Sequence, residues 1–374
     1  MQRILYVHGS TRPGGAWESL RDIVYGLERA RFEPVVACSK PPAWHGNTNG
    51  VETALIRMPM ARKGKSFPRI PFAISALRSL IRNRDVSLLH ANSLWDVPYA
   101  IWAIKPFKIP VVAHVRTEID SEKARKYYLD KADVVISTSR AAESILTEFG
   151  SLKGRVFYMP NGVDLRRFDP AISGDAVRNR YGFELDSIVF GAVGRIDHLK
   201  GLDLLIAAFS RVAETSERAR LLIVGEAKGK GSSFKDDLLR MIAERGLQDR
   251  IVMTGHQEDP IPYYAAIDIL VMPSRTEGFG RVVVEAMAMG KPIITSDAGA
   301  LPEIVWNGHT GYVVPLKDND ALVQRMIELG ASEMVRKTMG NAGRGLVEAR
   351  FDLDTAVSRL QSIYDVLLRT GKGD

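Results

Sequence analysis

The sequence predicts an α/β protein made of two doubly wound domains, each built on a parallel sheet. Three observations support this prediction. The chain has 374 residues, which is long for one hydrophobic core and makes two domains the default. Short β-branched runs alternate with segments of helical period along its whole length. These runs are continuously apolar, as in strands that helices cover on both faces of a parallel sheet.

The predicted strands fall into two sets. Those of the first half are 3–9, 34–39, 86–93, 110–116, 133–138 and 155–160, separated mostly by helical patterns such as 16–30, 71–84 and 140–149. Those of the second half are 188–195, 219–225, 250–255, 268–274, 292–297 and 310–315. Ligands of open parallel sheets bind at the carboxyl ends of the strands, so we expect the site in the loops that directly follow them.

The segment MPNGVDLRRFDP (159–170) is the predicted boundary between the domains, because it is rich in Pro, Gly, Asn and Asp. We therefore predict an N-terminal domain over 1–164 and a C-terminal domain over 165–352. The tail, 353–374, starts with a helical pattern that either completes the second domain or crosses back to the first.

Composition is that of an ordinary globular protein, with 45% hydrophobic and 25% charged residues. No apolar run approaches the roughly 20 residues that span a bilayer, and the N-terminus passes straight into a predicted strand. Cys38 is the single cysteine, which excludes an internal disulfide and a thiolate metal cluster. These features predict a cytoplasmic protein.

The net charge of +7 is unevenly spread. Residues 1–170 carry 26 Lys+Arg and 16 Asp+Glu, whereas the remainder carries 25 and 28. A basic first half suggests that it meets something anionic, such as phosphate esters, nucleic acid or an anionic membrane surface.

The segment 57–84 concentrates this charge, with eight Lys+Arg and no acidic residue. It predicts a helix with an apolar stripe and a basic stripe, formed by Ile70, Ile74, Leu77 and Ile81 and by Arg78 and Arg82. Two interpretations stay open: an amphipathic element on anionic lipid near a lipid-linked acceptor, or a helix that covers the sheet and keeps its arginines solvated. No nucleic acid partner is expected, because the basic run lacks the interleaved aromatic pattern that stacks bases.

Two glycine-bounded loops follow predicted strands. HGSTRPGGAWESL (8–20) places Gly14 and Gly15 before a helix, where backbone amides suit an anion, although a plain tight turn is equally compatible. It matches neither the dinucleotide fingerprint nor the phosphate loop that ends in Gly-Lys-Ser/Thr. GRIDHLKG starts at Gly194 and sets Arg195 and Lys200 five residues apart, where the two cations can flank a diphosphate or be solvated surface charges.

SRTEGFGRVVVEAMAMG (274–290) contains two glutamates with seven residues between them. Glu277 lies in the glycine loop, and a helix is predicted to start near Arg281 with its amides directed at whatever occupies that loop. Glu285 then lies about one turn further in, in a helix apolar on nearly all sides, and a buried carboxylate needs partners. A vicinal diol such as ribose offers two donors to it; a salt bridge with a neighbouring Arg is the alternative.

EGFGRVVVEAMAMGKPIITSDAGALPEIV resembles the E-x7-E region of the retaining glycosyltransferases of family 4, which have the GT-B fold. The resemblance extends to GRIDHLKG, PNGVD (160–164), NGHTGYVVPLKDNDAL (307–322) and the N-terminal Gly-Gly loop, and is strongest over 189–322. It implies two Rossmann-like domains that face each other across a deep cleft, where a nucleotide-diphosphate sugar binds as the donor. It implies no cofactor and no obligatory metal.

The resemblance also implies roles for matching positions. Glu285 holds the nucleotide ribose, and Glu277 contacts hydroxyls of the donor sugar. Further donor contacts come from the amides of Gly278, Phe279 and Gly280, from the glycines Gly14, Gly15 and Gly194, and from the segment around His256, where the base lies. Arg195 and Lys200 stabilise the diphosphate leaving group, a role that a divalent cation has in sugar transferases of another fold.

The chain departs from the family in two places. DAGALPE has Ala300 where a second glycine is common, a mild change that keeps phosphate contacts plausible, and the other departure concerns a histidine. The family often has a histidine in the loop after the fourth strand of the N-terminal domain, close to the sugar. Here that loop contains AHVRTE, and Arg116 rather than His114 aligns with the family's position, so either residue is a candidate to face the donor. The two Asp-x-Asp sequences, 318–320 and 352–354, stand at predicted helix starts and are interpreted as caps.

We therefore predict a retaining glycosyltransferase that moves a sugar to an acceptor hydroxyl in polysaccharide, glycolipid or cell-envelope glycan synthesis. Two rival interpretations remain: a GT-B sugar-nucleotide epimerase or hydrolase, and a nucleotide-sugar-binding protein without catalysis. The sequence does not distinguish among UDP, GDP and ADP donors.

Overall fold

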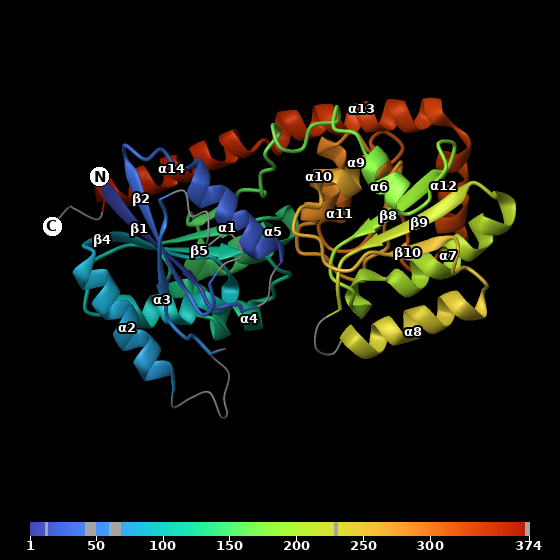
Figure 1. The fold of residues 1–374 in the computed structure, drawn as a ribbon. Coiled ribbons are helices and arrows are strands. Elements are labelled where there is room, and N and C mark those ends of the chain that lie inside the picture. The colour runs from blue at the N-terminus through green and yellow to red at the C-terminus, as the bar shows by residue number, and fades with distance from the viewer. Residues whose placement is uncertain (12–13, 42–49, 60–68, 228–230, 371–374) are drawn as a thin grey trace. The chain divides into compact units, whose positions relative to one another are not determined.

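A computed structural model describes residues 1–11, 14–41, 50–59, 69–227 and 231–370, which form two compact units. Unit 1 comprises Met1–Gly162 together with the C-terminal segment that starts at Leu353. Unit 2 comprises Val163–Asp352, so the chain passes from one unit to the other inside the Pro- and Gly-rich segment 159–170. Each unit has one parallel sheet between helices (Figure 1), which confirms the predicted fold class.

The sheet of unit 1 has seven strands in the order β3-β2-β1-β4-β5-β6-β7, and all neighbours are parallel. The strands are β1 (Gln2–His8), β2 (Phe32–Cys38), β3 (Glu52–Leu55), β4 (Val86–Ala91), β5 (Val111–Val115), β6 (Val134–Ser137) and β7 (Val156–Tyr158). Six of them were predicted. The edge strand β3 was not, because its residues ETAL are partly exposed and form no apolar run.

Helices cover both faces of this sheet (Figure 1). One face carries α2 (Ile70–Asn83), α3 (Val97–Ile104), α4 (Ser121–Lys126) and α5 (Arg140–Glu148). The other carries α1 (Gly15–Gly26) and the last helix, α14 (Leu353–Thr370). Tyr364 of α14 is fully buried beside Tyr6 and Phe32, so the final helix belongs to the core of unit 1.

The sheet of unit 2 has six parallel strands in the order β10-β9-β8-β11-β12-β13. They are β8 (Ile188–Val193), β9 (Ala219–Val224), β10 (Ile251–Met253), β11 (Ile269–Met272), β12 (Ile293–Ser296) and β13 (Gly311–Val314), all predicted from the sequence. The helices are α6 (Asp175–Arg180), α7 (Leu202–Thr215), α8 (Gly231–Glu244), α9 (Ile261–Ala266), α10 (Arg281–Ala288), α11 (Leu301–Ile304), α12 (Asn319–Ala331) and α13 (Glu333–Arg350). Both faces of the sheet are buried in separate apolar clusters, as continuous apolar strands require.

The helix α2 bears on the two interpretations of the basic segment 57–84. Ile70, Leu77 and Ile81 are buried against the sheet and Ile74 is half-buried, so the apolar stripe covers the core of unit 1. Arg82 is exposed, as the second interpretation expected, whereas Arg78 is half-buried and its Nη2 donates to the carbonyl of Trp102 at 2.9 Å. The part of this segment over 60–68 lies outside the described residues.

The structure bears on whether a helix could span a membrane and whether side chains could bind a metal ion. Among the helices of the described residues, none is long and apolar enough to cross a membrane. Over the same part of the chain, His, Cys, Asp and Glu side chains do not gather in groups of three or more that could hold a metal ion. Asp318 caps α12 by accepting from the Ala321 amide at 2.9 Å, as interpreted from the sequence.

Candidate functional site

In unit 2 the loops that follow β8, β9 and β10 touch one another through glycine backbones. The Gly225 amide donates to the Gly255 carbonyl at 3.0 Å, and the Gly194 amide donates to the Val224 carbonyl at 2.9 Å. A Cβ on Gly225 would lie 1.8 Å from the Gly194 carbonyl oxygen, so only glycine allows this approach. Gly225 therefore joins Gly194, a predicted donor-binding position, to Gly255, which precedes the predicted His256, at the carboxyl edge of the sheet.

The loop after β8 is also joined to the loop after β11. Gly201 has a left-handed backbone (φ 66°), and a Cβ there would lie 1.9 Å from the Pro273 carbonyl oxygen. The Arg275 amide donates to the Leu199 carbonyl at 2.8 Å, and the Arg275 guanidinium forks onto Asp203 at 2.8 and 2.6 Å. These contacts bring Lys200 next to the glycine loop that contains Glu277.

Replacing Gly201 by alanine should therefore destabilise unit 2 by about 2–4 kcal/mol, from the left-handed backbone and the clash with Pro273 together. Gly246→Ala is the matched control, because Gly246 has nearly the same backbone (φ 63°) and nothing within 4 Å of a Cβ. That control should cost only about 1 kcal/mol. Urea unfolding measures both, and equal losses would contradict the clash.

Lys200 and Glu277 form an ion pair between Nζ and Oε2, with both side chains about four-fifths buried (21% and 16% exposed). Arg195 lies beside this pair: it lines the same pocket as Lys200, with apolar walls from β8, β9 and β11. The Arg195 side chain is exposed and pairs with Asp197 at 3.2 Å. Three of the predicted residues thus come together as two cations and one carboxylate at the carboxyl ends of the strands.

The glycine loop leads directly into α10. The helix begins at Arg281, as predicted, after Gly280 with φ 97°. The Glu277 carbonyl accepts from the Ala300 amide at 3.0 Å, which anchors the loop. Gly278 is half-buried, whereas the Phe279 side chain is buried in the core against Phe351. Only the backbone of Phe279 is therefore left to contact a ligand.

Glu285 is 7% exposed, and both of its carboxylate oxygens have protein partners. Oε1 accepts from Arg281 Nε at 2.6 Å, and Oε2 accepts from the Tyr264 hydroxyl at 2.7 Å. Burial, followed by the charge of Glu285, raises the pKa of Tyr264 well above 10, so the phenol stays a donor. The salt bridge that the sequence left open is present, and the ribose contact of Glu285 stays a prediction.

His256, expected near the base, is exposed in the loop that follows Gly255. In unit 1, Gly14 and Gly15 are exposed where α1 begins. Asn92 holds the start of this helix by donating from Nδ2 to the Ala16 carbonyl at 3.0 Å. The sequence analysis did not single out Asn92, which ends an apolar strand and shows no spacing pattern.

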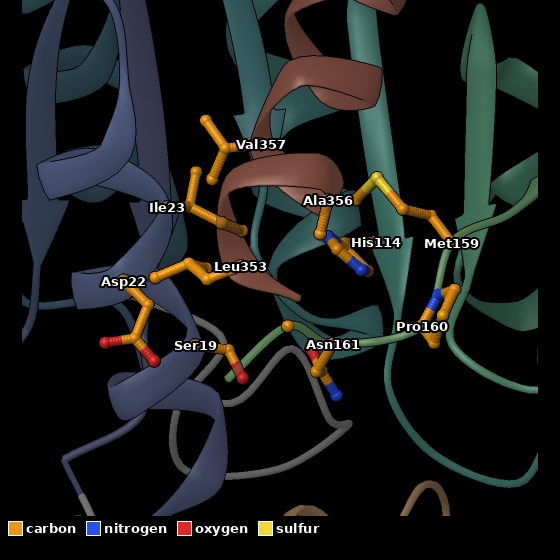
Figure 2. Close-up of a pocket in the computed structure, with 11 residues that line it drawn as sticks. Ser19, Asp22, Ile23, His114, Met159, Pro160, Asn161, Leu353, Ala356 and Val357 are labelled. Carbon is orange, nitrogen blue, oxygen red and sulfur yellow. The ribbon is translucent and has the colours of Figure 1, made fainter. Parts of the chain in front are cut away.

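The two candidates His114 and Arg116 touch each other; His114 lies within β5 rather than in the loop after it, and Arg116 directly follows the strand. Arg116 Nη2 lies 3.1 Å from His114 Nδ1, and the same guanidinium donates to the Asn92 carbonyl at 3.0 Å and to Asn161 Oδ1. His114 is 1% exposed, and His90 Nε2 lies 3.3 Å from its Nδ1. His114 also lines a pocket with Ser19, Asp22, residues 159–162 and the start of α14 (Figure 2).

Burial, with Arg116 as the second cause, lowers the pKa of His90 to about 3 and that of His114 well below 6.5. Below about pH 6.5 these histidines become protonated in the unfolded chain but stay neutral in the folded protein, so acid destabilises the fold. Urea titrations between pH 7.5 and 5 measure this loss as a fall in the unfolding free energy. The fall should be smaller in His90→Gln than in the wild type, and below pH 6.5 the difference should grow by about 1.4 kcal/mol per pH unit. Equal acid sensitivity in both proteins would contradict this.

Comparisons with known proteins agree with this architecture. Residues 13–167 match the family model Glycosyltransferase Family 4, and residues 174–346 match the model Glycosyl transferases group 1. The lipopolysaccharide core biosynthesis mannosyltransferase LpcC of Rhizobium leguminosarum bv. viciae is 31% identical over 246 residues, which cover 65% of this chain and 67% of LpcC. The capsular polysaccharide biosynthesis glycosyltransferase CapM of Staphylococcus aureus is 30% identical over 240 residues, 64% of this chain but only 60% of CapM.

Solved structures share the fold over nearly the whole chain. Anabaena HepE in complex with UDP and glucose has a TM-score of 0.84 at 22% identity, covering 98% of this chain and all of HepE. The sucrose-phosphate synthase of Thermosynechococcus elongatus has a TM-score of 0.86 at 24% identity, covering 99% and 100%.

Two Rossmann-like units, each with one parallel sheet, have the GT-B fold of one class of glycosyltransferases. Both halves match models of that class, and one relative is aligned over two thirds of its length. The chain belongs to the group 1 glycosyltransferases.

Proposed function

We propose that this protein is a retaining glycosyltransferase that moves a sugar from a nucleotide-diphosphate sugar to an acceptor hydroxyl. The observation that carries the proposal is the Lys200–Glu277 pair with Arg195 beside it, set at the carboxyl ends of parallel strands in a chain of this family. The names of CapM and LpcC favour an acceptor in polysaccharide or cell-envelope glycan synthesis.

The chemistry assigned to these residues is electrostatic. Arg195 and Lys200 stabilise the charge that develops on the leaving diphosphate, so the proposed reaction needs no metal and no other cofactor. Glu277 binds hydroxyls of the donor sugar, and Glu285 binds the ribose. Retention follows if the acceptor attacks from the face that the diphosphate leaves, with a phosphate oxygen taking the acceptor proton.

A thermal-shift screen with UDP-, GDP- and ADP-sugars tests the donor class, because a ligand that binds the folded state raises its stability. The stabilising donor is then incubated with glycan acceptors in the presence of a chelator, and the anomer of the product is assigned by NMR. Transfer with retention supports the proposal. Rapid donor turnover without acceptor favours an epimerase or hydrolase, and binding without transfer favours a non-catalytic protein.

We further propose that unit 1 binds an anionic membrane surface near the start of α2. Phe72 is 78% exposed there, next to the exposed Arg69. The other large apolar side chains of α2 are buried or half-buried, so Phe72 is the one on this helix that is able to insert. Flotation with vesicles rich in anionic lipid at low salt should recover the wild type and much less Phe72→Ser. Leu185→Ser is the control, because Leu185 is 95% exposed in unit 2; no flotation of the wild type would refute the proposal.

A further inference from the structure

A chain of hydrogen bonds runs through the buried core of unit 1, from α14 to the end of β5. The hydroxyls of Tyr6 and Tyr364 are 3.0 Å apart, and the Tyr364 hydroxyl lies 2.5 Å from His90 Nδ1. His90 Nε2 in turn lies 3.3 Å from His114 Nδ1. All four side chains are at most 1% exposed, so water does not complete their hydrogen bonds.

Such a chain has two self-consistent directions when its histidines are neutral. In one direction each hydroxyl and ring N–H donates towards His114, which then carries its proton on Nε2. In the other, every bond is reversed, and His114 donates from Nδ1 while Nε2 has only a lone pair. Tyrosine hydroxyls and imidazole rings can serve in either direction, so these four residues alone do not choose between them.

Arg116 removes this ambiguity, because a guanidinium has donors and no acceptor. Its Nη2 is 3.1 Å from His114 Nδ1, so that nitrogen must be an acceptor. The guanidinium shares the single lone pair of Nδ1 with the longer contact from His90 Nε2 at 3.3 Å, where a second lone pair would be repelled, so His90 carries its proton on Nε2. Asn92 and Asn161 accept from the rest of the guanidinium and hold it in place. We propose that Arg116 is a positioning residue: it sets the direction of the whole hydrogen-bond chain and so keeps the His114 proton on Nε2.

The direction decides what His114 offers to the pocket of Figure 2, which it lines with residues of α1, the segment after β7 and the start of α14. Its Nε2 is buried and, within the described part of the chain, has no hydrogen-bond partner. With the proton fixed there, His114 is a donor to an oxygen of a ligand, such as a hydroxyl, and is not a base. Only this consequence for substrates rests on the proposed function; the direction of the chain does not.

The test is the tautomer of His90 and His114 in the full-length protein, read from long-range ¹H–¹⁵N correlation spectra at neutral pH without any sugar nucleotide. The wild type should show both rings with the proton on Nε2 alone. Arg116→Met should convert both rings to mixtures of the two tautomers, since both directions are then satisfied. Arg116→Lys keeps a donor-only cation and should restore the Nε2–H form.

Tyr364→Phe is the matched control on the other side of His90. It removes the partner of His90 Nδ1 but leaves Arg116, so His114 should keep its proton on Nε2. A wild-type His114 protonated on Nδ1 would overturn the proposal, as would Arg116→Met with unchanged tautomers or Tyr364→Phe with a changed His114. The wild-type spectrum decides even if a variant does not fold. Because no transfer is measured, failure of the proposed glycosyltransferase activity gives a separate result.

Discussion

Glu285→Gln is expected to weaken nucleotide binding by roughly 10- to 100-fold, which corresponds to losing one or two charge-assisted hydrogen bonds from ribose hydroxyls. The amide keeps the size of the carboxylate: its oxygen can accept from Arg281 Nε, and its NH2 group can donate to the Tyr264 hydroxyl oxygen. Glu285→Ala is less informative, because it leaves the Arg281 guanidinium, 11% exposed, without its carboxylate and should cost about 3–5 kcal/mol of stability. Calorimetry with the donor nucleotide measures the affinity.

Tyr264→Phe separates binding from stability. It removes a protein partner of Glu285 while keeping the carboxylate, so unit 2 should lose about 1–2 kcal/mol of stability and nucleotide affinity should change by less than about threefold. An unchanged affinity in Glu285→Gln, at full folding, would show that Glu285 serves only its salt bridge with Arg281.

The strands and the site loops were predictable because their signals are local. Continuous apolar runs mark twelve of the strands, and the glycines around Arg195, Lys200 and Glu277 mark the turns that follow them. The pairing of Lys200 with Glu277 was not predictable, since it depends on Gly201 meeting the Pro273 carbonyl and on Arg275 bridging the two loops. Such close approaches leave no spacing pattern in a single sequence.

The network around Arg116 was hidden for a different reason. His90 and Tyr364 are 274 positions apart. His90 lies in a largely apolar strand and Tyr364 on the buried stripe of an amphipathic helix, positions where such residues are usually structural. Only the return of α14 to unit 1 brings them together. The alternatives that the sequence posed for His114 and Arg116 are also not exclusive, because the two side chains are in contact.

Lys200→Met is expected to lower kcat by about 10²- to 10³-fold while changing the donor KM by less than about tenfold, the pattern of a group that stabilises charge mainly in the transition state. Before the donor binds, Lys200 is neutralised by Glu277, so the pair must exchange its mutual contact for contacts with diphosphate and sugar. Glu277→Gln breaks the same pair from the other side, and it should raise the donor KM as well as lower kcat, because it removes a sugar contact. Steady-state rates over a donor concentration series separate the two effects.

Lys317→Met is the control for a simple change of net charge, because Lys317 is exposed and follows β13, which β12 separates from β11 in the sheet. Its kcat should equal that of the wild type. A Lys200→Met enzyme with kcat within about threefold of the wild type would assign Lys200 to holding the loop rather than the leaving group. The double variant Lys200→Met/Glu277→Gln adds a further check. If both residues act on one donor, the fold-loss of kcat in the double variant should be smaller than the product of the fold-losses in the two single variants.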